Sequence, residues 1–258
     1  MTPEQLTPGL PLGGPGDDGA DGISVDEALA LLRDGELSIE GRLVDASNAT
    51  FYCAVTCEGR TAACVYKPVA GERPLWDFPD GTLAEREVAA YEVSAATGWG
   101  IVPPTVLRDG PAGPGMVQLW VDADPSVNIG RFMRSDAAAL RNIAVFDAVV
   151  NNADRKGGHL LPMPGGHVYG VDHGVTFNAD HKLRTVLWQW AGDRLPGSTC
   201  EVLTELAAAL DGPLGERLGE LLTQRDLRRT RRRVDVLLAT GRHPEPRGDL
   251  PPVPWPPI

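Results

Sequence analysis

The sequence predicts an α+β protein with an antiparallel sheet in its N-terminal part and mainly helices in its C-terminal part. Three consecutive segments, Leu37–Val44, Thr50–Cys57 and Thr61–Tyr66, alternate polar and apolar residues or are rich in β-branched and aromatic ones. The later run Ala137–Asn151 instead has the periodicity of a largely buried helix. A chain of 258 residues, 42% of them hydrophobic, can form two lobes that share a cleft.

The composition indicates a globular protein whose surface as a whole repels polyanions, which leaves room for a local basic pocket. The 24 basic and 35 acidic residues give a net charge of −11, so we expect neither nucleic acid nor an anionic membrane as a partner. No apolar stretch approaches the roughly 20 residues of a membrane span, and no secretory leader is recognisable. We therefore expect a soluble, cytoplasmic protein. Its four cysteines are too few and too scattered for a disulfide framework, so we expect reduced thiols.

The first lobe is expected at residues 23–122, after a disordered Pro- and Gly-rich leader at 1–22. Ser24 and Glu27 have the spacing of a capping box that opens a short helix, Val25–Arg33. The three strands come next. The elements expected after them are a helix at Thr82–Thr97 and two strands, Ile101–Leu107 and Gly115–Val121, joined by a hairpin turn at Asp109-Gly110.

The second lobe is expected at residues 123–242, followed by an extended Pro-rich tail at 243–258 that packs through Trp255. After the buried helix we expect a hairpin with Asp172-His173-Gly174 between its strands. The remaining expected elements are the hairpin strands Val168–Val171 and Val175–Phe177 and the helices Cys200–Leu210, Pro213–Leu222 and Asp226–Ala239.

Candidate functional residues gather after the buried helix and at the end of the third strand. The helix leads into the polar cluster Asn151–Asp154 and a glycine-rich loop, whereas buried helices seldom end in such a cluster. Lysine is rare, at only three positions of the 24 basic residues. A lysine supplies a point charge that arginine does not. Lys67 closes the third strand, where it could bind phosphate oxygens or simply be a solvated strand end.

These residues resemble a known family. The set Lys67, Glu87, Asp154-Arg155-Lys156 with His159, and Val171-Asp172-His173-Gly174 resembles the protein-kinase-like fold, in particular its phosphatidylinositol 3-/4-kinase-like branch. The resemblance covers roughly residues 40–240, and it implies a bilobal fold. The chain is also similar to a small actinobacterial family distantly related to these lipid kinases.

The resemblance implies a role for each matching residue in phosphate transfer from ATP. Lys67 would contact the α- and β-phosphates, and Glu87 would orient Lys67. Asp154 would orient the acceptor hydroxyl, Lys156 would neutralise the transferring phosphoryl group, and Asp172 would hold Mg²⁺.

The nucleotide would have two further contacts. Ser47 and Asn48 stand where the family has its phosphate-covering loop, although this loop is not glycine-rich. Gln118, Leu119 and Val121 stand at the hinge that would bind adenine through backbone groups.

His159 is a departure from the family pattern, which has Asn as the second metal ligand at this position. Imidazole suits Mn²⁺ and other transition metals better than Mg²⁺. Either His159 is not a ligand, or the metal preference shifts towards Mn²⁺.

Three functions follow from the sequence. The first is an ATP- and metal-dependent kinase acting on a hydroxyl of a small molecule, lipid headgroup or protein. The second is a nucleotide-binding pseudokinase that acts through a protein partner. The third is a metal-dependent hydrolase built on His159, His167, Asp172 and His173. The basic run Arg228–Arg233 fits either a solvated helix face or an anionic partner, and the former is the more usual.

Overall fold

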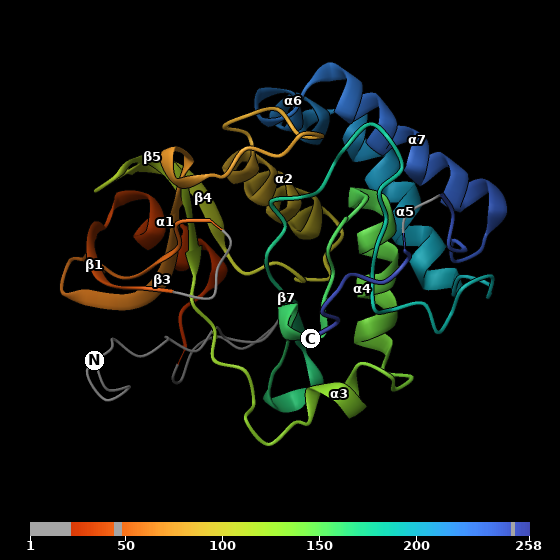
Figure 1. The fold of residues 1–258 in the computed structure, drawn as a ribbon, viewed down its shortest axis with the longest axis horizontal. Coiled ribbons are helices and arrows are strands. Elements are labelled where there is room, and N and C mark those ends of the chain that lie inside the picture. The colour runs from red at the N-terminus through yellow and green to blue at the C-terminus, as the bar shows by residue number, and fades with distance from the viewer. Residues whose placement is uncertain (1–21, 44–47, 249–250) are drawn as a thin grey trace. The chain divides into compact units, whose positions relative to one another are not determined.

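We describe a computed structural model of the chain, which covers residues 22–43, 48–248 and 251–258 (Figure 1). The expected α+β arrangement is confirmed, because one five-stranded antiparallel sheet precedes a mainly helical region. The chain divides into two compact units. Unit 1 contains the described residues up to Val88 together with Pro103–Asp122, and unit 2 contains Ala89–Val102 and Ala123–Ile258.

Unit 1 therefore differs from the first lobe expected at 23–122 in residues 89–102. These residues are bonded within unit 2. Glu92 pairs with Arg217 at 3.0 Å, and the Ile101 carbonyl accepts the N–H of Gly170 at 2.7 Å. Most of the leader expected at 1–22 lies outside the described residues, and the lobe limits stay a prediction.

The first helix of unit 1, α1 (Val25–Asp34), begins at the predicted capping box. The Ser24 hydroxyl accepts the N–H of Glu27, and the Glu27 carboxylate accepts the N–H of Ser24. These bonds from Ser24, with an ion pair to Arg60, lower the pKa of Glu27 to about 2. The other face of the helix buries Ala28, Leu31 and Leu32 in the core of the sheet.

The sheet of unit 1 has the order β1-β2-β3-β5-β4, and all its neighbouring strands are antiparallel. The first three strands confirm the prediction. Their buried positions include Cys53 and Cys64, which face each other across β2 and β3, and all four cysteines carry free thiols. The strands are β1 (Glu36–Arg42), β2 (Phe51–Cys57), β3 (Arg60–Pro68), β4 (Thr105–Gly110) and β5 (Gly113–Leu119), and α2 (Leu83–Ala96) lies between β3 and β4.

The expected positions of the last two strands and of their turn were wrong. β4 starts at Thr105 rather than Ile101, because Pro103 and Pro104 have no N–H to donate to a neighbouring strand. The turn falls on Pro111-Ala112 rather than Asp109-Gly110, since Gly110 is paired with Gly113 inside the ladder. Gly113 has a φ of 94°, which a residue with a side chain rarely adopts.

Unit 2 is built around the buried helix α4 (Ala138–Val150), which confirms the strongest helical prediction. The three C-terminal helices also confirm their predictions to within a few residues, and α4, α5 and α7 pack together (Figure 1). No helix in the described residues is both long and apolar enough to span a membrane. The other elements are α3 (Ile129–Phe132), α5 (Gly197–Leu210), α6 (Pro213–Leu221) and α7 (Gln224–Thr240).

The hairpin expected around Asp172 was wrong. The strand β7 (Val168–Gly170) pairs instead with β6 (Leu160–Pro162), and the segment 171–177 contains no strand. The hydrogen bonds that replace the missing ladder come from other parts of unit 2: the Phe177 N–H donates to Val150 O, and the Val171 N–H donates to His159 O. Local alternation alone does not specify the partner of such a short strand.

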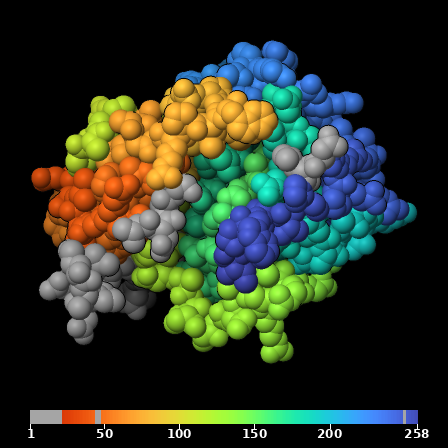
Figure 2. Space-filling model, viewed as in Figure 1, coloured from red at the N-terminus to blue at the C-terminus, as the bar shows by residue number. Residues whose placement is uncertain are grey.

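The C-terminal segment 251–258 has no helix or strand, as expected, but it does not pack through Trp255, which is 87% exposed. Pro254 is the buried residue. The Pro252 carbonyl accepts the N–H of Thr185, and the Pro257 carbonyl accepts the N–H of Gly157. Figure 2 shows this segment in dark blue on the surface of unit 2.

The basic run on α7 is divided between internal bonds and solvent. Arg231 pairs with Asp211 and Asp235, and Arg233 donates to the carbonyl of Val149. The other three arginines of the run are exposed: Arg228, Arg229 and Arg232. This division agrees with the interpretation of the run as a helix face.

The buried side chain of His243 should make the protein less stable in acid. The imidazole is 4% exposed, its Nε2 atom has no hydrogen-bond partner among the described residues, and burial lowers its pKa to about 4. Since the unfolded chain binds this proton at a pH near 6.5, we expect the free energy of unfolding to fall by on the order of 2 kcal/mol between pH 6.5 and 4.

Denaturant unfolding at pH 7, 5.5 and 4.5 tests this, with His243→Leu as the variant that cannot titrate. The wild type should lose more stability than His243→Leu over this range. Equal losses in the two proteins would show that other groups account for the acid dependence.

Candidate active site

Unit 1 contains a buried Lys–Glu ion pair. Lys67 lies in β3 opposite Met116, and its Nζ atom is 2.7 Å from Oε1 of Glu87 on α2. The side chain of Glu87 is only 2% exposed and that of Lys67 is 20% exposed, so α2 and β3 hold the ammonium in one position while leaving part of it accessible. The role of Lys67 in binding phosphate stays a prediction.

Only one of the two candidates in the phosphate-covering loop lies within the described residues. Ser47 lies outside the described residues. Asn48 is described, and its side-chain oxygen accepts the N–H of Arg73 at 2.9 Å. The Ala49 N–H also donates to the Gly71 carbonyl, so the end of this loop is tied to the segment that follows β3.

The three hinge candidates occupy different environments. Gln118 is buried, and its amide donates to the Thr105 hydroxyl at 2.8 Å. Leu119 belongs to the core, and its N–H donates to the Pro104 carbonyl. Since the N–H of Trp120 donates to the Ala63 carbonyl, we expect a backbone contact with a base to fall at Val121.

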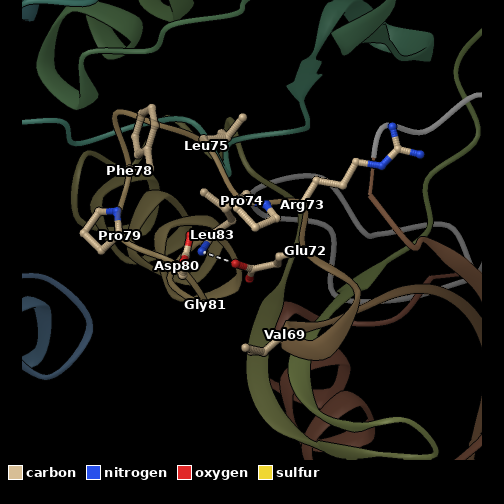
Figure 3. Close-up of a pocket in the computed structure, with 10 residues that line it drawn as sticks. All are labelled: Val69, Glu72, Arg73, Pro74, Leu75, Phe78, Pro79, Asp80, Gly81 and Leu83. Atoms are coloured by element: carbon tan, nitrogen blue, oxygen red, sulfur yellow. Dashed lines mark hydrogen bonds between the residues drawn. The ribbon is translucent and has the colours of Figure 1, made fainter.

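A cavity of about 200 Å³ in unit 1 lies next to the start of α2 (Figure 3). Ten residues line it, nine from the segment between β3 and α2 and the tenth, Leu83, at the start of α2. At its edge, the Glu72 carboxylate accepts the N–H groups of Leu83 and Ala84 at the start of α2, while Arg73 points away. Burial and the nearby Glu72 raise the pKa of Glu85. The cavity therefore adjoins the cap of α2, and its lining residue Arg73 bonds to the candidate Asn48.

The loop after α4 places the two catalytic candidates of unit 2 side by side. Asn151 ends the helix in a left-handed conformation, and its side chain bonds to Asn178, Asp180 and Lys182. The Asp154 carboxylate and the Lys156 ammonium are 3.0 Å apart and partly exposed, at 31% and 24%. A carboxylate and a point charge are thus together at the surface of unit 2.

The two metal-ligand candidates also lie close together. Nε2 of His159 is 3.5 Å from Oδ2 of Asp172. His159 follows Gly157 in a 3₁₀ turn, and the backbone N–H of Lys156 points to its Nδ1, so Nε2 faces the carboxylate. Burial lowers the pKa of His159, although Asp172 acts in the opposite direction. A neutral imidazole beside a half-exposed carboxylate can bind a cation.

The other two histidines of the hydrolase alternative are engaged elsewhere. His167 Nε2 lies 3.1 Å from the Gly100 carbonyl, and His173 Nε2 lies 2.6 Å from the Arg155 guanidinium. Within residues 22–43, 48–248 and 251–258, no three His, Cys, Asp or Glu side chains form a group that could hold a metal. The bonds of His167 and His173 favour the kinase hypothesis over the hydrolase one.

Sequence reasoning missed Asp147 as a member of this site. It lies on α4 with no exposed side-chain area, and its carboxylate binds Arg155 at 2.9 Å. Its signal was present in the sequence: a single acid within the apolar run that forms α4. A buried charge in such a helix needs a partner.

Comparison with known proteins places the chain in a family. Protein Rv2133c of Mycobacterium tuberculosis is 46% identical to it over 266 residues, which cover 90% of this chain and 95% of the relative. The chain belongs to the Rv2133c family. No family model matches the sequence.

Comparison with solved structures shows that this chain has a kinase-like fold. The Golgi casein kinase with Mn/ADP bound has a TM-score of 0.57 and is 14% identical, over 84% of this chain and 75% of that one. A second Golgi casein kinase structure has a TM-score of 0.53 and is 13% identical, with the same coverage. At this identity the likeness shows the fold alone, and the phosphatidylinositol 3-/4-kinase-like branch stays a prediction.

The Lys67–Glu87 pair generates a prediction about stability. Replacing Lys67 by Met leaves a buried carboxylate without its ammonium and should reduce the free energy of unfolding by about 3 kcal/mol. Replacing Glu87 by Leu in the same protein should restore most of the loss, because no charge then remains buried.

Denaturant unfolding of the two single variants and the double variant measures this. Arg60→Met is the control, since Arg60 and Glu27 form an exposed pair that is expected to contribute less than about 1 kcal/mol. A double variant as unstable as Lys67→Met would contradict the prediction.

Proposed function

We propose that this protein is an ATP- and metal-dependent kinase that transfers the γ-phosphate to a hydroxyl group. The observation that carries the proposal is the pairing in unit 2 of Asp154 with Lys156 and of Asp172 with His159, on a kinase-like fold. Phosphoryl transfer needs little covalent chemistry from a protein, and it depends on positioned charges. These two pairs are such charges.

Asp154 and Lys156 have complementary roles in the proposed transfer. The Asp154 carboxylate accepts a hydrogen bond from the acceptor hydroxyl, aims its oxygen at the γ-phosphorus, and takes the proton as the new O–P bond forms. The bond from the γ-phosphorus to the β–γ bridging oxygen breaks, and ADP leaves. The Lys156 ammonium, 3.0 Å from Asp154, neutralises charge on the transferring group.

Asp172 and His159 fit a divalent metal. Their Oδ2 and Nε2 atoms are 3.5 Å apart, which allows both to bind one ion with little movement, and a carboxylate with an imidazole suits Mn²⁺ better than Mg²⁺. When bound, the ion would neutralise the β- and γ-phosphates. The Mn/ADP in the Golgi casein kinase structure supports this choice of cofactors.

In unit 1, Lys67 would bind the α- and β-phosphates, and the buried Glu87 would hold its ammonium in place. Asn48 and Ser47 would cover the phosphates, and the hinge residues Gln118, Leu119 and Val121 would make the adenine contact.

Three further points belong to the proposal. The protein would belong to the phosphatidylinositol 3-/4-kinase-like branch and would be located in the cytoplasm. Its acceptor would be a small molecule, a lipid headgroup or a protein.

His159 favours one alternative, a nucleotide-binding pseudokinase. The imidazole stands where the family has Asn and already contacts Asp172, an arrangement that a protein without catalysis could keep. ATP binding without any transfer or hydrolysis of phosphate would identify this alternative.

Asp172→Asn and Asp154→Asn should separate metal binding from transfer. Asp172→Asn removes a charged ligand, so it should abolish the gain in ATP affinity that Mn²⁺ or Mg²⁺ confers. Asp154→Asn should leave ATP binding intact and lower ATP turnover roughly 10²–10⁴-fold.

Calorimetry with and without metal and an assay of ADP release measure the two effects. Asp180→Asn is the control, an exposed aspartate of unit 2 that pairs with Arg225. Undiminished metal-dependent binding in Asp172→Asn would remove Asp172 from the site.

His159→Asn should shift the metal preference towards Mg²⁺, because an amide oxygen then replaces the imidazole nitrogen. The measurement is the ratio of ATP dissociation constants with Mn²⁺ and with Mg²⁺, in the wild type and the variant. His167→Asn is the control, since His167 bonds to the Gly100 carbonyl. An unchanged ratio would place His159 outside the metal's ligands.

A further inference from the structure

The buried guanidinium of Arg155 links its own loop by hydrogen bonds to α4 and to the segment 171–173 of unit 2. Its side chain has no exposed area, and neither has that of Asp147. Its Nε and Nη2 atoms donate to the Asp147 carboxylate, and its Nη1 donates to the Val171 carbonyl at 3.0 Å. Its Nη2 also lies 2.6 Å from Nε2 of His173.

Stability alone does not account for this buried ion pair. Removing two charges from water is costly, and well-packed apolar residues often stabilise a core equally well. The Asp147 carboxylate also accepts bonds from the Asn152 amide and the Thr185 hydroxyl. The network therefore joins α4, the loop that carries Asp154 and the segment that carries Asp172.

The backbone of Asp172 shows what the network holds. Asp172 has a φ of 63°, in the left-handed region that residues with a side chain rarely adopt. Such a conformation persists when the surrounding structure determines it. Its two neighbours in the chain, Val171 and His173, are both bonded to the same guanidinium. Arg155 thus holds Asp172 from both sides.

The contact with His173 is chemically specific. A guanidinium only donates hydrogen bonds, so Nε2 of His173 accepts and the ring proton lies on Nδ1. The imidazole also packs edge-to-face with the ring of Phe146, with ring centres 5.6 Å apart. Phenylalanine could make the ring contact but not the hydrogen bond, whereas glutamine could supply an acceptor.

We propose that Arg155 is a positioning residue. Through Val171 and His173 it sets the position of the Asp172 carboxylate relative to Asp154, which directly precedes Arg155 in the chain. This proposal rests on the proposed function, in which Asp172 binds the metal and Asp154 orients the acceptor. A lysine could keep the charge beside Asp147 but could not reach all three partners.

Hydrogen exchange of the protein without ligands tests the positioning directly. Arg155→Lys and His173→Phe should raise exchange in residues 171–174 by at least about tenfold, with the sheet of unit 1 unchanged. Arg233→Lys is the matched control, a largely buried arginine of unit 2 that donates to the Val149 carbonyl. Unchanged exchange at 171–174 would overturn the proposal. If Arg155→Lys does not fold, His173→Phe decides, because it leaves the buried ion pair in place.

Calorimetric binding of ATP with and without Mn²⁺ tests the consequence. His173→Phe should lose about tenfold of the affinity gained from Mn²⁺, while metal-free ATP binding stays unchanged and His173→Gln keeps most of the gain. Equal losses with and without Mn²⁺ would indicate a purely structural role and overturn the proposal. If the wild type binds no ATP, the proposed function fails, and hydrogen exchange still decides whether Arg155 positions Asp172.

Discussion

The constraint on which unit 2 depends is that a charge taken out of water must have all its hydrogen-bonding groups satisfied. Arg155 is fully buried, and its donors are directed at Asp147, Val171 and His173. Asp147 lies on α4, whereas Val171 and His173 lie in the segment 171–173. Satisfying one guanidinium therefore fixes where α4, the loop after it and the segment 171–173 lie relative to one another.

The same rule explains the arrangement of the candidate site residues. Glu87 is buried but paired with Lys67, whose ammonium remains partly exposed. The carboxylates of Asp154 and Asp172 remain exposed enough to meet a ligand, at 31% and 52%, and each has a basic side chain beside it. The fully buried charges of Arg155 and Asp147 connect parts of unit 2, and the candidate site charges there are the partly exposed ones. In the proposed function, the imidazole of His159 would favour a transition metal.

Much of the fold and of the candidate site could be predicted because the signals are local. The capping box at Ser24, the alternation of β2 and β3 and the apolar period of α4 each depend on residues within a few positions. The order of lysine, glutamate and two aspartates along the chain was also visible, and with it the resemblance to kinases. Their roles stay predictions, since a sequence pattern does not show that the groups act together.

The sequence by itself determined most of the helices, the first three strands and the set of candidate site residues. The tertiary structure alone decided the pairing of β6 with β7, the turn at Pro111-Ala112 and the hydrogen bonds of Arg155. For the buried network of Arg155 and Asp147 the reason is distance along the chain: Arg155 meets His173 across 18 positions, and Asp147 meets Thr185 across 38. Such contacts form when several elements pack at once, and no local period records them.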